Sequence, residues 1–505
     1  MGVASLFRSL VPSGRCPGEQ RSASRETPGR ETFFVEIIKP SHYDDDGYVI
    51  QWRRGFIPSN SLGSLYGLVL DAARRRVLGD DVEISINVRD ETNSVIRIKR
   101  IIHEFRCNSN RGLVCLVGVQ TNQFPRALDI ARAFRAAGIQ VAIGGFHVSG
   151  CIAMLPALTS ELTEALRLGV TLFAGEAEAH LDELLKASNE GRLRPIYNYM
   201  AELPHLENRP VVFLPRRHIR RYVGRMGCFD AGRGCPFSCS FCTIINVQGR
   251  KSRFRTADEV EKLMRANLRQ GARSVLITDD NFARNKNWEN IFDRLIELRT
   301  RGSLQVNFTL QADMLSHKIP NFISKAAQAG CNQVYIELES INPESLKSAS
   351  KGQNRITEYR RMLQAWRSSG AIIYGGYILG FPQDTPESIR RDISIIQREL
   401  PIDMLHFFML TPLPGSKDHR DLFLQGAWLE PDLNRYDSEH ATAHHRQMTA
   451  EQWELIYKQV WELYYSREHI ETLLRRAVAT GTSSRALSLA IFQHPASVMN
   501  QRFVE

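Results

Sequence analysis

Three cysteines stand close together in the stretch GCPFSCSFC, residues 234–242. Cys235, Cys239 and Cys242 follow the spacing C-x3-C-x2-C, and no cysteine pair follows them later in the chain. Structural zinc sites usually take four protein ligands from paired units, so this run fits zinc poorly. Thiolates also hold iron-sulfur clusters, and three of them leave one iron open to a substrate or cofactor. The spacing therefore indicates a cluster with a vacant position, with three free loop thiols as the competing interpretation.

Short β-rich runs alternate with amphipathic helical stretches from about residue 31, which indicates an α/β protein with helix-covered parallel sheets. Residues 31–190 predict a doubly wound domain of five strands, whose ligand should lie beyond the carboxyl ends of the strands. Residues 191–224 are rich in proline and arginine and are expected to be a linker. Residues 225–416 contain six strand-helix units, fewer than a full barrel has, and predict a partial, splayed barrel.

The two ends of the chain differ from this pattern. Residues 1–30 are rich in Arg, Ser, Gly and Pro and are expected to be a disordered leader. Residues 417–505 are expected to form a mostly helical subdomain.

No apolar run is long enough to span a membrane, and nine cysteines without secretory spacing favour a reducing cytoplasm. The net charge of +10 comes from arginines spread along the chain, which gives nucleic acid binding little support.

Placed where the first barrel strand ends, the cysteine motif resembles that of the radical S-adenosylmethionine (SAM) enzymes. In that family C-x3-C-x2-C holds a 4Fe-4S cluster inside a partial (β/α)6 barrel. The resemblance implies that Cys235, Cys239 and Cys242 ligate three irons and that the amine and carboxylate of SAM bind the fourth. It also implies that one electron from a partner such as a ferredoxin or flavodoxin cleaves SAM to a 5′-deoxyadenosyl radical.

Other barrel segments resemble SAM contacts of the same family. An aromatic residue before the third cysteine would pack near the adenine, and the TDDNF segment would receive the methionyl amine. Two glutamates on one face of the fourth strand would bond the ribose, and two glycines on the fifth would allow close backbone approach. Helix caps and solvated carboxylates are the competing interpretations. The expected SAM contacts are Phe241, Asp279, Asp280, Asn281, Glu337, Glu339, Gly376 and Gly380.

The stretch VAIGGFHVSG, residues 141–150, is a strand that runs into a Gly-Gly turn, which lets a bulky planar ligand approach the backbone. Joined to a doubly wound domain directly before the barrel, it resembles the cobalamin-binding module of cobalamin-dependent radical SAM enzymes. Ordinary turn residues and helix caps are the competing interpretation. The expected cobalamin contacts are Gly118, Gln120, Thr121, Gly144, Gly145, His147, Ser149, Gly175 and Glu176.

The wider cobalamin-binding family carries D-x-H-x-x-G after its first strand, and the histidine ligates cobalt. Here His42 stands near the expected place, but Pro40 and Asp45 replace the aspartate and the glycine. Without that aspartate no partner orients the imidazole. The sequence therefore predicts cobalamin bound without a protein histidine ligand.

The resemblance implies a methyltransferase. One SAM would methylate cob(I)alamin, a second would supply the radical, and methylcobalamin would methylate an unactivated carbon of a small-molecule, lipid or tetrapyrrole-type substrate. A radical oxidoreductase or cyclase that uses cobalamin without net methylation is one alternative. An RNA-modifying methylthiotransferase is another, although the chain lacks that family's second cysteine trio and its C-terminal RNA-binding barrel.

Overall fold

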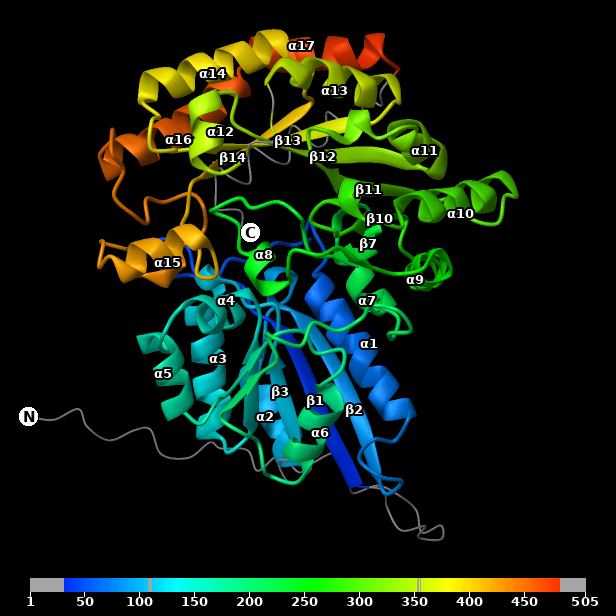
Figure 1. Cartoon of the computed structure of the whole chain (residues 1–505). Coiled ribbons are helices and arrows are strands. Elements are labelled where there is room, and N and C mark those ends of the chain that lie inside the picture. Colours follow the sequence, from blue (N-terminus) through cyan, green and yellow to red (C-terminus); the bar gives the residue numbers. More distant parts are fainter. Residues whose placement is uncertain (1–30, 108–110, 352–353, 355, 482–505) are drawn as a thin grey trace, which may run out of the picture.

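The computed structural model describes residues 31–107, 111–351, 354 and 356–481. Its ribbon has two sheet-containing halves, with the N-terminal half below and the C-terminal half above in Figure 1. The expected leader, residues 1–30, and residues 482–505 of the expected C-terminal subdomain lie outside the described residues.

The N-terminal half is a doubly wound domain around one parallel sheet of strand order β2-β1-β3-β4-β5-β6. Its chain alternates strand and helix, so each crossover helix packs on a face of the sheet. The strands are β1 (Glu31–Lys39), β2 (Val82–Asp90), β3 (Gly112–Leu116), β4 (Gln140–Gly144), β5 (Thr171–Ala174) and β6 (Ile196–Asn198). The helices are α1 (Asn60–Arg74), α2 (Ile98–Arg106), α3 (Phe124–Ala136), α4 (Phe146–Met154), α5 (Ser160–Arg167) and α6 (Leu181–Asn189).

Two hydrophobic clusters lie on opposite faces of this sheet. One contains residues of α1 and α6, and the other contains residues of α2, α3, α4 and α5. The central strands β3 and β5 are buried along their whole length, as expected for parallel strands covered on both faces. The predicted doubly wound domain is confirmed.

One expectation about this half needs correction. The segment 191–224 is no simple linker: it contains β6, which pairs with β5, and the short helix α7 (Arg216–Ile219). β6 was missed because three residues are too few to show a period. Pro156 lies between α4 and α5 and separates these two helices, because proline interrupts a helical pattern.

The C-terminal half contains a second parallel sheet, ordered β14-β13-β12-β11-β10-β7. Its six strands form an open, partial barrel, as predicted, with helices on the outside (Figure 1). The strands are β7 (Met226–Phe229), β10 (Ser274–Ile277), β11 (Asn307–Ala312), β12 (Cys331–Glu339), β13 (Ile372–Leu379) and β14 (Met404–Met409), and β8 (Gly232–Arg233) pairs with β9 (Arg253–Phe254). The helices are α8 (Ile244–Val247), α9 (Ala257–Arg269), α10 (Trp288–Thr300), α11 (Phe322–Ala329), α12 (Pro343–Ser348), α13 (Ile356–Ser368) and α14 (Pro386–Glu399).

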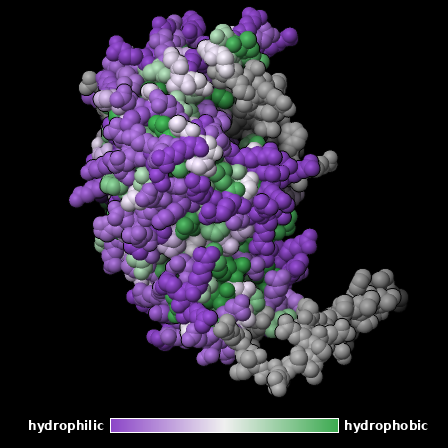
Figure 2. Space-filling model, turned by 90° about the vertical axis from the view of Figure 1, so that its right-hand side faces the viewer, coloured by the Kyte–Doolittle hydropathy of each residue, from purple (hydrophilic) through white to green (hydrophobic). Residues whose placement is uncertain are grey.

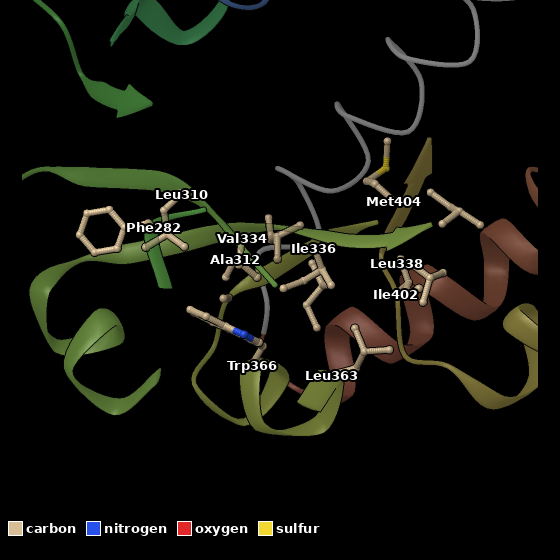
Figure 3. Close-up of a cluster of buried hydrophobic side chains, with 14 of the residues drawn as sticks. Phe282, Leu310, Ala312, Val334, Ile336, Leu338, Leu363, Trp366, Ile402 and Met404 are labelled. Atoms are coloured by element: carbon tan, nitrogen blue, oxygen red, sulfur yellow. The ribbon is translucent and has the colours of Figure 1, made fainter. Parts of the chain in front are cut away.

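The side chains of β12 alternate between the hydrophobic core and the interior of the barrel. Val334, Ile336 and Leu338 are fully buried and lie toward the helix that carries Leu363 and Trp366 (Figure 3). Each such buried side chain stabilises the fold by about 1.5–3 kcal/mol. Because successive side chains point to opposite faces, the intervening polar residues of β12 face the barrel interior.

Three helices follow the barrel: α15 (Lys417–Leu424), α16 (Ala450–Tyr464) and α17 (Arg467–Ala479). Trp453, Trp461 and Tyr464 of α16 are buried against the barrel, so these aromatic side chains pack the helix onto it. Short 3-10 helices occupy Glu91–Asn93, Thr121–Gln123, Val223–Arg225, Phe282–Arg284, Ser316–Lys318 and Leu433–Arg435.

The exposed surface is mainly polar. The face in Figure 2 is predominantly hydrophilic, with small hydrophobic areas scattered among the polar side chains. Within the described part of the chain, every helix is too short or too polar to cross a membrane.

Candidate functional site

The three cysteines lie on the loop that connects β8 to β9, close after the first barrel strand. Cys239 is 7% exposed, and Cys235 and Cys242 are partly buried. The Cys235 N–H donates to the carbonyl of Gly249 at 3.2 Å, and the Cys242 N–H donates to the carbonyl of Cys239 at 3.2 Å. These bonds fix the backbone at both ends of the motif.

Gly234 is required for this loop to close. Its φ of +87° lies in the left-handed region, and a Cβ there would lie 2.6 Å from the carbonyl oxygen of Lys251. A side chain would therefore push the two arms of the loop apart just before Cys235.

Burial raises the pKa of Cys235 and of Cys242 to about 12, so both are neutral thiols at pH 7 without a cationic partner. Reactive cysteines have lowered pKa values, whereas a coordinating metal deprotonates a thiol outright. The loop is therefore suited to a metal cluster and unsuited to nucleophilic cysteine chemistry.

Asp279 fixes the start of the cysteine loop from the end of β10. Its Oδ1 accepts the N–H groups of Ala231 at 2.7 Å and Gly232 at 2.8 Å, and its Oδ2 accepts Asn285 Nδ2 at 3.0 Å. Both carboxylate oxygens of this predicted SAM contact are therefore engaged with the protein.

Asp280 lies beside the cysteines. Burial, followed by the charges of Asp279 and Glu337, raises the pKa of Asp280 to about 7. Its charge in turn acts on the thiols of Cys235 and Cys242. Of the acidic pair, Asp280 is the carboxylate whose charge acts on these two cysteine thiols.

Asn281, the third predicted contact in this segment, donates from Nδ2 to Asp313 Oδ2 at 2.9 Å. Arg284 also binds Asp313, with Nη2 2.8 Å from Oδ1. The Arg284 guanidinium lies 5.4 Å from the ring centroid of Phe237, which belongs to the cysteine loop. Sequence reasoning missed Arg284, whose guanidinium supports the loop by a cation–π contact.

Lys351 is the charged group at the centre of the barrel site, and sequence reasoning missed it as well. Its Nζ lies 2.8 Å from Glu337 Oε2, also donates to Glu339, and lies 5.7 Å from the ring centroid of Phe241. The Lys351 side chain is 2% exposed. Glu339 itself has a left-handed backbone with φ +64°. Such strain in a non-glycine residue is frequent at functional sites.

A cavity, termed here the barrel cavity, opens at the carboxyl ends of β12, β13 and β14. Four of the predicted SAM contacts line it: Phe241, Glu337, Glu339 and Gly376. Gly376 is a close-approach position, because a Cβ there would lie 2.3 Å from the hydroxyl of Tyr335.

Gly380 is also a close-approach position, but the group that approaches is Trp453. With φ +99°, a Cβ on Gly380 would lie 2.1 Å from the indole ring. The indole Nε1 donates to the carbonyl of Leu379 at 3.3 Å. In this structure Gly380 therefore makes room for the C-terminal helix α16.

A second cavity, termed the lower cavity, lies at the carboxyl ends of the strands of the first sheet. It has a volume of about 180 Å³ and an apolar floor between the sheet and helices α1 and α6. The barrel contributes Arg233, Val247 and Gln248 to its wall. Six predicted cobalamin contacts line it: Gly118, Gly144, Gly145, Ser149, Gly175 and Glu176.

The remaining three predicted cobalamin contacts lie elsewhere. Gln120 and Thr121 line a third cavity, the junction cavity, between the two halves. His147 lines neither cavity and is 1% exposed. His42 lies near Asp437, whose charge acts on it, and burial lowers the pKa of His42.

An ion-pair network joins the lower cavity to the cysteine loop. Arg233 donates to Glu176 at 2.6 Å, and Arg253 donates to the same carboxylate at 2.9 Å. Burial alone would raise the pKa of Asp230, but Arg233 and Arg255 lower it to about 2. Sequence reasoning placed Glu176 beside a ligand and did not foresee its pairing with two barrel arginines.

The fold and site define a class of α/β protein in which a three-cysteine loop at the mouth of a partial barrel faces a doubly wound domain. Residues 231–396 match the Radical SAM superfamily. This part of the chain is a radical SAM domain, as expected from its three cysteines.

Similar proteins point to one branch of this superfamily. The chain is 28% identical to bacteriochlorophyllide d C-12(1)-methyltransferase of Chlorobaculum tepidum over 328 residues, which cover 62% of this chain and 68% of the relative. The structure of the radical SAM methyltransferase TsrM from Kitasatospora setae, with cobalamin and a [4Fe-4S] cluster bound, matches with a TM-score of 0.59 at 18% identity over 79% of each chain. The cobalamin-dependent radical enzyme OxsB, with aqua-cobalamin and SAM bound, matches with a TM-score of 0.62 at 14% identity over 94% of this chain and 76% of its own. The last two likenesses confirm the predicted two-domain fold.

Proposed function

We propose that this protein is a cobalamin-dependent radical SAM methyltransferase that methylates an unactivated carbon of a small-molecule substrate of lipid or tetrapyrrole type. Cys235, Cys239 and Cys242 would hold a 4Fe-4S cluster, the barrel cavity would take SAM, and the lower cavity would take cobalamin. The similar methyltransferase that acts on bacteriochlorophyllide d and the similar folds solved with cobalamin support this assignment.

The continuity of the three cavities carries the proposal. Phe146 lines both the lower and the junction cavity, and Leu413 and Ser438 line both the junction and the barrel cavity. The cavities therefore adjoin in a row, with the junction cavity in the middle. This order suits a reaction in which a substrate lies between a methyl donor and a radical source.

The lower cavity fits a ligand that has both apolar and hydrogen-bonding groups. Asn60 Oδ1, Ser64 Oγ and Gln248 Oε1 are buried in its wall and have no hydrogen-bond partner in the described part of the chain. Buried polar atoms are normally paired, and two of these three are amide oxygens that accept hydrogen bonds, so the wall is suited to a ligand that carries amide N–H groups. Cobalamin carries such groups around an apolar ring and base.

Cobalt would take no imidazole from the lower cavity, since none of the described residues that line it is a histidine. We propose that His42 instead interacts with Asp437, whose charge acts on its imidazole. This agrees with the broken D-x-H-x-x-G pattern in the sequence.

When bound, the cluster with SAM supplies a 5′-deoxyadenosyl radical, and cobalamin supplies a methyl group. The protein groups bind and orient: Asp280 would accept the methionyl ammonium beside the cysteines, and Phe241 would pack on the adenine. Lys351 holds Glu337 and Glu339 together against their mutual repulsion, at the wall where the ribose hydroxyls would bond.

The junction cavity would hold the substrate. Its wall combines apolar side chains such as Phe146, Ile244 and Leu413 with the polar groups of Gln120 and Asp437. No lysine or arginine is among the described residues that line it. An amphipathic substrate that carries hydrogen-bonding groups therefore fits better than one that places an anion inside.

The test is anaerobic reconstitution of the purified full chain with iron, sulfide and hydroxocobalamin, followed by reaction with SAM, a chemical reductant or ferredoxin, and bacteriochlorophyllide d as the probe substrate. We expect a 4Fe-4S spectrum, bound cobalamin, and release of both 5′-deoxyadenosine and S-adenosylhomocysteine. Cys235→Ala should abolish the cluster spectrum and SAM cleavage, whereas the control Cys331→Ser should keep both. Cys331 lies in β12 and donates to the carbonyl of Gln333 at 3.2 Å, a bond that serine can also make.

Mass spectrometry of metabolites from a deletion strain grown with cobalamin then identifies the natural substrate. We also propose that the protein is located in the cytoplasm. Release of 5′-deoxyadenosine without any methylated product or S-adenosylhomocysteine, from that natural substrate, would contradict methyl transfer. That result would support a radical oxidoreductase or cyclase instead.

A further inference from the structure

His147, Cys151 and Glu161 form a cluster of metal-ligating side chains at the junction of the two halves. Histidine and cysteine are one helical turn apart on α4, and the glutamate lies in the first turn of α5. One ligand atom from each of the three lies within 4.8 Å of the other two. His147 is 1% exposed and Cys151 is 2% exposed. The proposed function uses none of these side chains.

The histidine is already oriented as a ligand would be. His147 Nδ1 lies 3.2 Å from the hydroxyl of Thr121, and Nε2 lies 3.2 Å from Glu161 Oε1. When Nδ1 carries the proton and donates to Thr121, Nε2 and the carboxylate are two acceptors that face each other. A cation between them, a proton or a metal ion, removes that repulsion. Metal-binding histidines generally donate their second N–H to such a partner.

The candidate for a fourth ligand is His419 on α15. His419 is 6% exposed, and its Nδ1 is buried without a hydrogen-bond partner in the described part of the chain. The charges of His147 and Glu161 both act on its ring, which places it beside the cluster. The backbones also meet: a Cβ on Gly150 would lie 2.4 Å from the carbonyl oxygen of Pro414, just before α15 begins.

We propose that His147, Cys151, Glu161 and His419 bind a structural zinc ion that joins α4 to α15. Two imidazoles, a thiolate and a carboxylate are all ordinary zinc ligands, and four protein ligands are typical of a structural site. Ligands at zinc bond lengths of about 2.0–2.3 Å lie about 3.3–3.8 Å apart in a tetrahedron. The ligand atoms of His147, Cys151 and Glu161 lie within 4.8 Å of one another, so rotamer adjustments of roughly 1 Å suffice for these three, and His419 would turn its ring toward them. The buried thiol would be deprotonated by the metal.

The ion would fix two segments that line the junction cavity. Phe146 begins α4 and Pro414 immediately precedes the α15 segment, and both line that cavity. A metal between the helices would therefore hold the doubly wound domain against the C-terminal segment. Its role is structural, and it differs from that of the three cysteines that belong to the cluster.

The test uses the full chain with Cys235, Cys239 and Cys242 all replaced by alanine, so that the cluster cysteines bind no metal. After incubation with zinc and extensive dialysis, we expect one zinc ion per chain by elemental mass spectrometry. Replacement by Co²⁺ should give a near-ultraviolet thiolate-to-metal band together with the visible absorption of a tetrahedral site.

In the same background, Cys151→Ser should abolish the near-ultraviolet band, and His419→Gln should abolish stoichiometric zinc binding. The control Cys331→Ser should change neither. Absence of stoichiometric zinc in the parent, or a thiolate band that survives Cys151→Ser, overturns the proposal. Should the serine variant fail to fold by circular dichroism, zinc retained by His419→Gln overturns it equally.

This inference is independent of the proposed methyltransferase function. Zinc is measured in a chain that cannot assemble the cluster, whereas SAM cleavage is measured in the chain with its native cysteines. Either result can fail while the other stands.

Discussion

Arg233 Nη1 donates a hydrogen bond to Glu176 Oε2 at 2.6 Å, and both side chains are less than 10% exposed. The arginine stands two residues before Cys235, and the glutamate follows the end of β5 in the other half of the molecule. The same guanidinium binds Glu178 and Asp230. One buried cation therefore ties the cysteine loop to the wall of the lower cavity.

Arg233→Met should destabilise the protein by about 3–5 kcal/mol, because a buried carboxylate left without its partner is strongly destabilising. Of the three carboxylates that bind Arg233, Glu178 would lose most of its charge compensation. Its side chain is 5% exposed, and no other side chain donates to it in the described part of the chain. The double variant Arg233→Met with Glu178→Gln should therefore be more stable than Arg233→Met alone. Thermal unfolding of the wild type, both single variants and the double variant measures this coupling. Simple additivity of the two changes would contradict it.

Lys351→Met should abolish SAM-dependent activity and lower stability. It leaves Glu337 and Glu339 facing each other in a buried site without the cation that holds them, a loss worth about 3–5 kcal/mol. Lys351→Arg keeps the charge and should retain the fold and part of the activity. The measurements are thermal unfolding and 5′-deoxyadenosine release. An active Lys351→Met enzyme would show that the lysine is dispensable at this site.

Gly380→Ala should destabilise the protein by about 3 kcal/mol or more. The added methyl group would overlap the Trp453 ring, and the residue would also keep a strained left-handed backbone. The matched experiment repeats Gly380→Ala in a Trp453→Leu background, where the steric part of the cost is removed. A smaller penalty there, measured by chemical unfolding, confirms the contact. An equal loss of stability in both backgrounds would mean that backbone strain causes the whole effect.

Ser64→Trp should reduce bound cobalamin by at least about tenfold and leave the cluster iron unchanged. Ser64 lies on α1, and its hydroxyl faces the lower cavity without a partner in the described part of the chain, so an indole there fills the cavity. Ser64→Ala leaves the space open and serves as the control. The ratio of cobalt to iron after reconstitution measures the result. A variant that lost both metals would point to misfolding, and one that kept cobalt would exclude this cavity as the cobalamin site.

The sequence was sufficient to predict both sheets and the cysteine loop, because each depends on a local pattern. Alternation in β12 separated core side chains from Glu337 and Glu339, and the spacing of the cysteines needed no partner elsewhere. Lys351 was missed because it lies in the loop after α12, which brings it back beside β12. The sequence of this loop has no hydrophobic periodicity that would indicate the contact.

The contacts between the two halves were not predictable for a similar reason. Arg233 and Glu176 are separated by 57 residues, and nothing local distinguishes them from the other charged residues of a basic chain. Gly380 was expected to let the adenosyl group of SAM approach the backbone, and in the structure an indole ring packs against it. Its neighbour, Trp453, comes from a helix whose packing only the folded chain defines.

His218 makes the protein sensitive to acid. Burial, followed by the charges of Arg217 and Arg221, lowers the pKa of His218 to about 4, and its Nε2 accepts a hydrogen bond from Arg217 Nε at 3.1 Å. The folded state therefore binds this proton less readily than the unfolded chain, whose histidine has a pKa of about 6.5. Stability should fall as the pH drops from about 6.5 toward 4, by about 2 kcal/mol at pH 5.

His218→Gln isolates that contribution, because an amide oxygen can accept the Arg217 bond and does not titrate. The measurement is the difference in unfolding free energy between pH 7 and pH 5 for the wild type and the variant. Since every other titrating group is common to both proteins, the wild type should lose about 2 kcal/mol more than the variant on acidification. Equal losses would show that His218 is protonated in the folded state without cost. The two arginines beside it make that outcome electrostatically unfavourable, because protonation would bring a third positive charge into a buried site.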